Sequence, residues 1–335
     1  MARRREWEQR RSDERVAANA DQAEFSAVSY GSCNLEAGTA DERIADAMDG
    51  YELADPMQVP DWAREDAKYD SATSAIAEEV IRRRGLLGKS YPFRLTGNRI
   101  VYSHSHTLAY EFCLAVTQAP SLSEGEYKRL PPAFERLVRD AAICFLGRKA
   151  SGYRTGWPPD ELEERPKRFR DVVERLHELT GEWCWNPRSG LPKNPVPRDV
   201  KDLGLDFVVW QGVPDRRVGQ IFLLGQCACG DDWSTKSHDL DIGKVHRWIQ
   251  PLSAATPLRV FATPRHIPND AYFGEVNETA GLTFDRARIA LLAEMAGNRD
   301  FMVGQARERY EDLIRLVIQD FQPGKQPDSP TRAGH

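Results

Sequence analysis

Asp206, Gln226 and Glu135 are the residues of this sequence whose types and positions suit metal-assisted chemistry. Asp206 lies at the head of the apolar, β-rich run Leu205 to Trp210, and Gln226 lies near the end of the run Gly219 to Cys227. The segment between the two runs carries a Gly, a Pro-Asp pair and two Arg, which is typical of a hairpin turn. Because the head of one antiparallel strand lies beside the tail of the next, the two side chains could converge at one end of a sheet. Such an oxygen-rich pair would suit a divalent cation.

Glu135 belongs to a segment with a clear helical pattern, Pro131 to Gly147, which has prolines at its start and a glycine at its end. Two interpretations of this glutamate are open. As an acid placed in the first turn, it would stabilise the helix through the macrodipole. Alternatively, it faces the site formed by Asp206 and Gln226.

Composition limits the classes of protein to which the chain can belong. Its 335 residues are enough for a sizeable core and predict two domains. No apolar run approaches the ~20 residues that span a bilayer, and no apolar segment follows the basic start as a secretory signal requires. The six scattered cysteines indicate reduced, mostly buried thiols in a cytoplasmic protein. A net charge of −5 excludes a bulk polycation, so nucleic-acid binding would need a local basic face or a partner.

The elements that must position these residues form four predicted regions. Residues 1–58 are expected to be a largely disordered or loosely packed arm. Residues 59–125 are expected to form a small helix–hairpin–helix domain, with a helix over Asp61 to Arg84, a hairpin over Tyr91 to Ser103 that turns at Gly97-Asn98, and a helix over Leu108 to Ala119. Residues 126–321 hold the candidate site, and residues 322–335 are expected to be a disordered tail.

Within residues 126–321 the pattern predicts helices and strands in a fixed order. The segment after Gly147 is rich in Gly, Pro, Arg and Lys and is expected to be a loop that suits contact with a phosphate backbone. A helix is predicted over Phe169 to Gly181, a first strand over Glu182 to Asn186, and a broadly helical segment over Trp233 to Ile249. The remaining prediction is a strand within Pro257 to Pro264 and two closing amphipathic helices.

This order, with these residues, resembles the PD-(D/E)XK nuclease superfamily, also called restriction-endonuclease-like. The resemblance covers roughly Pro131 to Pro264 and implies an α/β fold, a mixed central sheet flanked by helices, here preceded by a small α+β domain. Asp206 matches the acid that opens the second strand, and Gln226 matches the second motif position, which is glutamine in Mrr-like members. Glu135 matches the glutamate that many members place on the first core helix.

The resemblance implies roles for these residues around Mg²⁺ or Mn²⁺. Glu135, Asp206 and Gln226 would be metal ligands, and the backbone carbonyl of Cys227 is a candidate further ligand. The family lysine is expected two residues after Gln226, where this chain has Ala228. Lys236 is therefore the candidate for the catalytic cation.

The implied function is a metal-dependent DNA endonuclease that serves a bacterial anti-phage or restriction system, with a possible homo-oligomeric state. The alternative is a catalytically inactive nuclease-fold module that binds nucleic acid or docks on a partner ATPase or helicase, which the acidic net charge favours somewhat. Cys227, Cys229 and His238 suggest a zinc site as a rival interpretation. The spacing C-x-C and the lack of a further nearby soft ligand argue against it.

Overall fold

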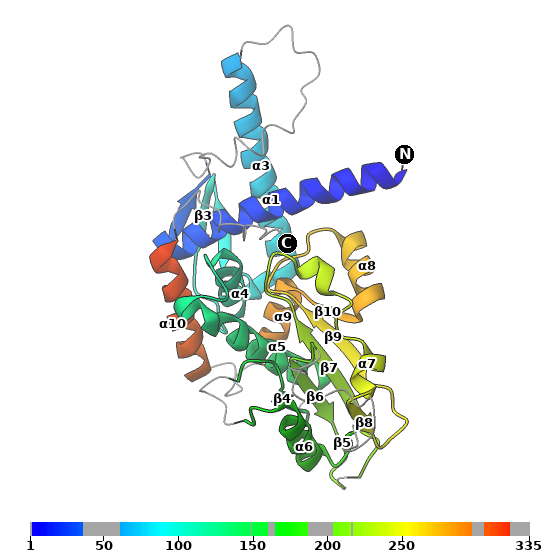
Figure 1. Ribbon diagram of the computed structural model, residues 1–335. Coiled ribbons are helices and arrows are strands. Elements are labelled where there is room, and N and C mark those ends of the chain that lie inside the picture. The colour runs from blue at the N-terminus through cyan, green and yellow to red at the C-terminus, as the bar shows by residue number, and fades with distance from the viewer. Residues whose placement is uncertain are drawn as a thin grey trace.

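The structure is a computed structural model, which describes residues 2–35, 61–147, 149–159, 165–186, 204–215, 217–296 and 305–321. Figure 1 shows a helical part that carries a small sheet, and beside it a larger sheet with its own helices. Within these ranges, no helix combines the length with the apolar character that crossing a bilayer requires.

The helical part is built from N-terminal elements that surround a small sheet. Its elements are α1 (Ala2–Tyr30), β1 (Ser32–Asn34), α3 (Asp61–Leu87), η1 (Gly88–Ser90), β2 (Phe93–Thr96), β3 (Arg99–Tyr102) and α4 (Ala109–Gln118). The strands form an antiparallel sheet in the order β1-β3-β2. The predicted hairpin is confirmed, and Gly97 in its turn has a φ of 57°, a left-handed conformation that favours glycine. The helices predicted before and after the hairpin are confirmed as α3 and α4.

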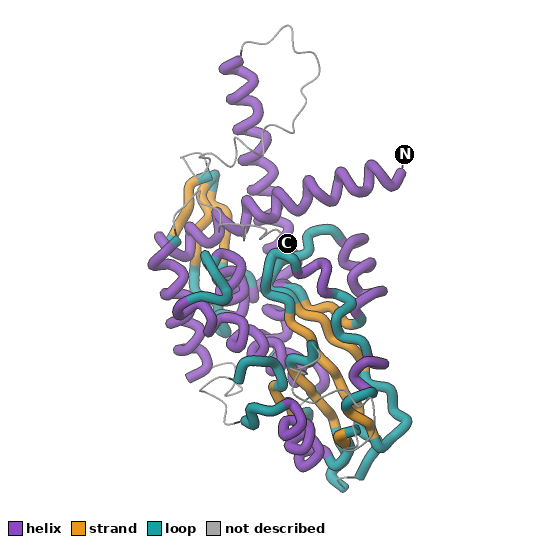
Figure 2. The backbone as a smooth tube through the Cα atoms, viewed as in Figure 1, coloured by secondary structure: helices purple, strands orange, loops and turns teal. Residues whose placement is uncertain are grey.

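The described N-terminal residues differ from the expected arm. Residues 2–30 form α1, and its Ala20, Phe25 and Ala27 have no exposed surface. Figure 2 shows this helix lying across α3, and the two are in contact. Small alanine side chains let α1 approach its neighbours closely, a packing signal that composition alone does not reveal. Residues 36–60 and the expected C-terminal tail lie outside the described ranges.

A five-stranded sheet forms the centre of the larger part. Its strands are β4 (Ser151–Arg154), β6 (Phe207–Gln211), β7 (Ile221–Cys227), β9 (Leu258–Ala262) and β10 (Leu282–Phe284), in the order β10-β9-β7-β6-β4. The predicted antiparallel pair is confirmed, since β6 and β7 pair with Phe207 opposite Gly225. β4 is antiparallel to β6, whereas β9 runs parallel to both β7 and β10. The protein is thus a mixed α/β protein with a mixed central sheet.

Two predictions about this sheet are wrong. Its first strand is β4, which lies in the segment expected to be a loop. The predicted first strand instead forms β5 (Trp183–Trp185), which pairs with β8 (Ile249–Pro251) in a separate ribbon. The helix expected over Trp233 to Ile249 consists of only two short pieces, η4 (Trp233–Lys236) and α7 (Ile242–His246).

Helices cover both faces of the sheet. On one face lie α5 (Leu130–Leu146) and α9 (Arg286–Met295), which share an apolar core with Phe207 and Val209. On the other face α6 (Phe169–Thr180), α7 and the β5–β8 ribbon pack against Val208 and Leu224. The predicted helices at α5 and α6 and the two closing helices are confirmed. The remaining helical elements are η2 (Gly125–Arg129), α8 (Asp270–Ala280) and α10 (Gln305–Asp320).

The first of these cores also crosses the predicted domain boundary near residue 125. It contains residues of α1, α3 and α4 together with residues of α5, α9 and α10. α4 contacts α5, α9 and α10. The small α+β unit and the sheet therefore share one apolar core, and the helical part supports the same face of the sheet on which α5 lies.

Candidate functional site

Backbone hydrogen bonds hold Asp206 at the junction of β4, β6 and β7. Its N–H donates to the carbonyl of Gly225 at 2.8 Å, next to the end of β7. Its carbonyl accepts from the N–H groups of Thr155 and Gly156, just beyond β4, at 2.8 and 2.9 Å. Because three strands converge on this residue, the sheet fixes the position of its carboxylate.

Two contacts define the place of the Asp206 carboxylate. Its Oδ2 accepts a hydrogen bond from the N–H of Cys227 at 2.6 Å. Its Oδ1 lies above Gly156, where an added Cβ would come within 2.9 Å of it. The partly exposed Asp206 thus presents one oxygen to the end of β7 and the other to the segment after β4.

Glu135 reaches the same place from α5. A Cβ added at Gly156 would overlap Glu135 Oε2 as well as approach Asp206 Oδ1. The two carboxylates are therefore close neighbours, and the space between them and the chain admits only glycine at position 156. We call Glu135, Asp206 and the adjoining Arg154 the carboxylate site.

The environment of Glu135 decides between its two interpretations. α5 begins at Leu130, so its first turn contains no acid. The Glu135 side chain is buried, with 6% of the residue exposed, and pairs with Arg154 instead of the helix terminus. The macrodipole explanation is wrong, and the structure brings Glu135 to Asp206 as the second interpretation predicted.

Arg154 at the end of β4 supplies a positive charge that pairs with Glu135. It is fully buried, and its Nε donates to Glu135 Oε2 at 2.6 Å. Its Nη2 donates to the carbonyl of Pro158 at 2.9 Å. Its Nη1 is also buried but has no hydrogen-bond partner in the described part of the chain. The sequence interpretation missed Arg154, because its strand is short and its segment is dominated by Gly, Pro and charged residues.

The thiols of Cys227 and Cys229 lie in the electrostatic field of the carboxylate site. Burial raises the pKa of the Cys227 thiol well above its ordinary value, and the charges of Asp206 and Glu135 add to this, whereas Arg154 opposes it. Burial and the same two carboxylates raise the pKa of the Cys229 thiol. The raised pKa values favour the protonated form of both thiols. The Cys227 group that contacts Asp206 is its N–H; a ligand role of its carbonyl stays a prediction.

Gln226 does not join the pair of acids. Its Oε1 accepts a hydrogen bond from the N–H of Leu240 at 3.2 Å. It lies two residues after Leu224 on β7 and therefore faces the same core, formed by α6 and α7, away from α5. The expected convergence fails because Asp206 precedes the first paired residue of β6, Phe207, and escapes the strand alternation. Leu205 packs in the same core as Val208, a spacing that the regular pleat does not allow.

Lys236 is directed to a different partner. Its Nζ pairs with Asp232 Oδ1 at 3.0 Å, and 38% of the Lys236 side chain is exposed. Its charge lowers the pKa of the Cys229 thiol, against the larger effects of burial, Glu135 and Asp206. The contacts thus pair Arg154 with Glu135 and Lys236 with Asp232.

The rival zinc interpretation gains no support from the described residues. Among the described residues, which include Cys227, Cys229 and His238, no three His, Cys, Asp or Glu side chains are arranged as a metal site. The acidic ligands that the carboxylate site offers are the two carboxylates.

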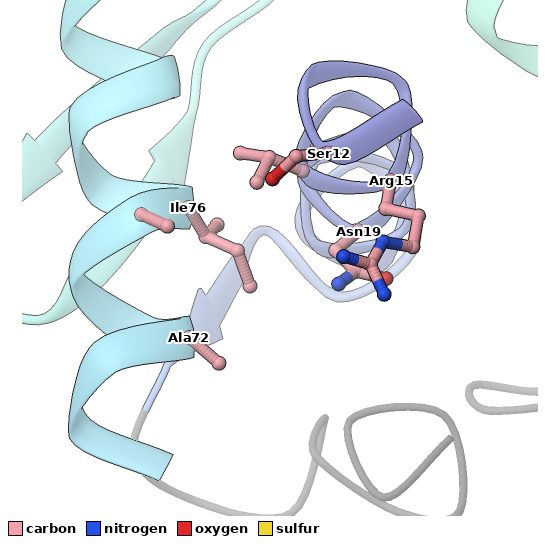
Figure 3. Close-up of a pocket in the computed structure, with 7 residues that line it drawn as sticks. Ser12, Arg15, Asn19, Ala72 and Ile76 are labelled. Carbon is pink, nitrogen blue, oxygen red and sulfur yellow. The ribbon is translucent and has the colours of Figure 1, made fainter. Parts of the chain in front are cut away.

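A pocket lies elsewhere, between α1 and α3. Figure 3 shows Ser12, Arg15 and Asn19 of α1 facing Ala72 and Ile76 of α3 across it. Its lining holds one charged group, Arg15, and no acid, base or nucleophile that could act with it. The pocket reflects loose packing of two helices and offers no chemistry comparable with the carboxylate site.

The comparisons with known proteins add no family to this geometry: no family model, no curated protein and no solved structure matches the chain.

Proposed function

We propose that this protein is a divalent-metal-dependent phosphodiesterase that cleaves DNA, with Glu135 and Asp206 as the metal ligands. The observation that carries the proposal is the convergence of these two carboxylates over Gly156, from a helix and a strand end that are far apart in the sequence. Buried or half-buried acids of like charge repel each other, so such a pair is costly unless a cation joins it.

The residues present fit Mg²⁺ or Mn²⁺. These hard ions prefer carboxylate oxygens, and Mg²⁺ is usually bound through one or two carboxylates while it keeps several waters. Glu135 and Asp206 provide that number of carboxylates. A Cβ at Gly156 would overlap Glu135 Oε2 and come within 2.9 Å of Asp206 Oδ1, so glycine lets the chain lie close to both carboxylates.

The order of elements supports a restriction-endonuclease-like core. The helix α5 precedes three antiparallel strands, β4, β6 and β7, and the next strand of the sheet, β9, runs parallel to β7. The acid opens the second of these strands, and the glutamate is on the first helix. Both positions agree with the resemblance that the sequence indicates.

The chemistry that fits this site is hydrolysis of a phosphodiester. The oxygen of a water forms a bond to phosphorus, the bond between phosphorus and the leaving oxygen breaks, and one proton of the water passes through solvent to that oxygen. A divalent cation there supplies a Lewis acid that lowers the pKa of water and stabilises negative charge on the phosphoryl oxygens. Glu135 and Asp206 would hold the ion, and Arg154 pairs with the Glu135 carboxylate at 2.6 Å.

Exposed cations in the segment that follows Gly156 suit a polyanionic substrate. Lys167 and Arg168, which lie before α6, are exposed. Trp157 adjoins Gly156, with 44% of its surface exposed. Exposed cations near an aromatic ring are what a phosphate backbone with stacked bases requires, so they supply a local basic face on a chain whose net charge is −5.

A second candidate is an inactive nuclease-fold module that binds nucleic acid or a partner protein such as an ATPase or helicase. The observation that favours it is the ion pair between Arg154 and Glu135, which neutralises one acid without a metal. In either case a role in bacterial defence against phage rests on the family resemblance.

Plasmid degradation by the purified chain tests the first proposal against the second. Mg²⁺-dependent cleavage is expected from the wild type, with a loss of at least ~100-fold in Asp206→Asn and in Glu135→Gln. The matched control is Glu278→Gln, which removes an exposed carboxylate from α8 and should cleave normally. Cleavage that survives both site substitutions would exclude this site. DNA binding without cleavage in the wild type would favour the inactive module.

A further inference from the structure

Arg154 has one hydrogen-bond donor more than the described protein satisfies. Its Nε is bound to Glu135 and its Nη2 to the Pro158 carbonyl, at 2.6 and 2.9 Å. Its Nη1 is buried, yet no described group accepts from it. Buried donors without an acceptor are rare in folded proteins, and each one needs an explanation such as strain or an absent ligand. For a fully buried guanidinium that pairs with Glu135 of the carboxylate site, an absent ligand is the favoured explanation.

The charges of the site indicate what kind of ligand would bind. Glu135 and Asp206 carry two negative charges and Arg154 carries one positive charge, so the three groups together are negative. A bound divalent cation reverses this and leaves one net positive charge. A phosphodiester has one negative charge and non-bridging oxygens that accept hydrogen bonds, so it neutralises the loaded site and satisfies the donor.

We propose that Nη1 of Arg154 binds a non-bridging oxygen of the substrate phosphodiester, which makes Arg154 the cation of the proposed reaction. The inference rests on the proposed function, since it names the phosphate-binding group of that same site. The bond to Pro158 and the pair with Glu135 fix the guanidinium plane before substrate arrives. An already ordered donor loses little conformational freedom on binding.

Lys236 lacks the two features that favour Arg154, an ordered buried side chain and an unsatisfied donor. It is paired with Asp232, is partly exposed and ends the short element η4. A phosphate contact from Lys236 would have to break that pair and order a flexible side chain. Arg154 is already in place and has an unpaired donor.

The test compares binding of a short fluorescent DNA duplex in Ca²⁺, followed by fluorescence anisotropy, with cleavage of the same duplex in Mg²⁺. The decisive variant is Arg154→Lys, which keeps the charge opposite Glu135 but cannot also reach Pro158 and a phosphate oxygen. Arg154→Gln removes the charge as well. Arg286→Lys is the matched control, because Arg286 is also fully buried and paired with a carboxylate, that of Asp21, away from the site. All measurements are made well below the unfolding temperature of each variant.

The expected result is a loss of DNA affinity of about tenfold or more in Arg154→Lys. Arg286→Lys should bind as the wild type does, and Mn²⁺ affinity in Arg154→Lys should change far less than DNA affinity. Wild-type DNA affinity in Arg154→Lys, or an equal loss in the Arg286→Lys control, overturns the inference. A loss in Lys236→Gln in place of Arg154→Lys also overturns it.

The two proposals fail in different ways. If the wild type binds the duplex but does not cut it, the proposed function fails, and the binding comparison still decides the role of Arg154. If the wild type cuts the duplex and Arg154→Lys both binds and cuts normally, only the role of Arg154 fails. If the wild type neither binds nor cuts, both are wrong.

Discussion

Two clusters of buried charge in this protein differ in whether the hydrogen bonding of their arginines is complete. The N-terminal charge cluster joins α1, α3 and α9 and consists of Asp21, Glu24, Glu79, Arg83 and Arg286. Arg83 there donates to the carboxylates of Asp21, Glu24 and Glu79, to the hydroxyl of Tyr110 and to the carbonyl of Ala17. In the carboxylate site, by contrast, Arg154 keeps one buried donor without an acceptor.

This difference separates a structural use of charge from a functional one. A buried ionic network in which each cationic donor is satisfied fixes the arrangement of helices and has nothing left to offer a ligand. Two neighbouring carboxylates beside an arginine with one unsatisfied donor are unfavourable by themselves. Binding of a ligand makes the arrangement favourable. The comparison predicts opposite responses of the two clusters to the same kind of substitution.

The largest expected effect is on stability in the N-terminal charge cluster. Arg83→Met leaves Glu24 buried without its main counter-charge and removes one of the two arginines paired with Glu79. It should lower the free energy of unfolding by about 3–5 kcal/mol. Urea denaturation measures it. Arg170→Ala is the control, since it breaks an exposed pair with Glu174 in α6 and should change the free energy by less than about 0.5 kcal/mol. A similar small change in Arg83→Met would mean that the cluster does not stabilise the fold.

Asp21 and Glu24 of the same cluster should affect the pH dependence of stability in opposite directions, because their pKa shifts have opposite signs. Burial would raise the pKa of Asp21, but the guanidinium groups of Arg286 and Arg83 overcome burial and hold it well below its ordinary value of 3.8. Asp21 therefore stabilises the fold above pH 3.8, and this contribution is lost as the pH falls further. Burial raises the pKa of Glu24 above its ordinary value of 4.5, against the opposing charge of Arg83. Glu24 therefore adds stability as the pH falls towards 4.5.

Urea midpoints measured between pH 7 and pH 3 check these signs. The decline in acid should be shallower in Asp21→Asn and steeper in Glu24→Gln than in the wild type. Parallel pH profiles for all three proteins would contradict the assignment of the two shifts.

Replacing Asp21 or Asp206 by asparagine should change stability at neutral pH by different amounts. Asp21→Asn should cost about 3 kcal/mol because it leaves Arg83 and Arg286 short of a counter-charge. Asp206→Asn should change stability by less than about 1 kcal/mol, because it removes a negative charge beside Glu135 and still accepts from the Cys227 N–H. Thermal unfolding of both variants gives the comparison. Equal losses would place Asp206 among the structural charges.

Gly156→Ala should combine a modest effect on stability with a large effect on function. Gly156→Ala places a methyl group against Glu135 Oε2 and should cost about 1–2 kcal/mol while it displaces the carboxylate and abolishes metal binding. Gly274→Ala in α8 meets nothing within 4 Å and should leave metal binding unchanged. Calorimetric titration with Mn²⁺ distinguishes the two variants, and normal binding by Gly156→Ala would place the ion elsewhere.

The sequence predicted those elements whose periodicity or turn chemistry is strong. The hairpin at Gly97, the helix that carries Glu135 and the pairing of β6 with β7 follow from local pattern. The strand β4 could not be predicted in this way, because it has only four residues and one of them is glycine. Its strand conformation depends on pairing with β6, which is a tertiary contact. The same limit applies to α1, whose burial depends on neighbours distant in the sequence.

The site was predicted in part, for a related physical reason. Asp206 and Glu135 meet, as predicted. Gln226 lies on the opposite face of the sheet, because the irregular backbone before β6 turns Asp206, and not Gln226, towards α5. Arg154 could not be recognised before β4 was known. A constellation of side chains depends on strand register and on the pleat at its ends, which a single sequence specifies only weakly.

The account is tested most directly by electron paramagnetic resonance of Mn²⁺ titrated into the full chain. It predicts one bound ion per chain in the wild type, no specific binding in Asp206→Asn or Glu135→Gln, and retained binding in Gln226→Ala. An ion that still binds after both carboxylates are replaced, or no bound ion in the wild type, would contradict it.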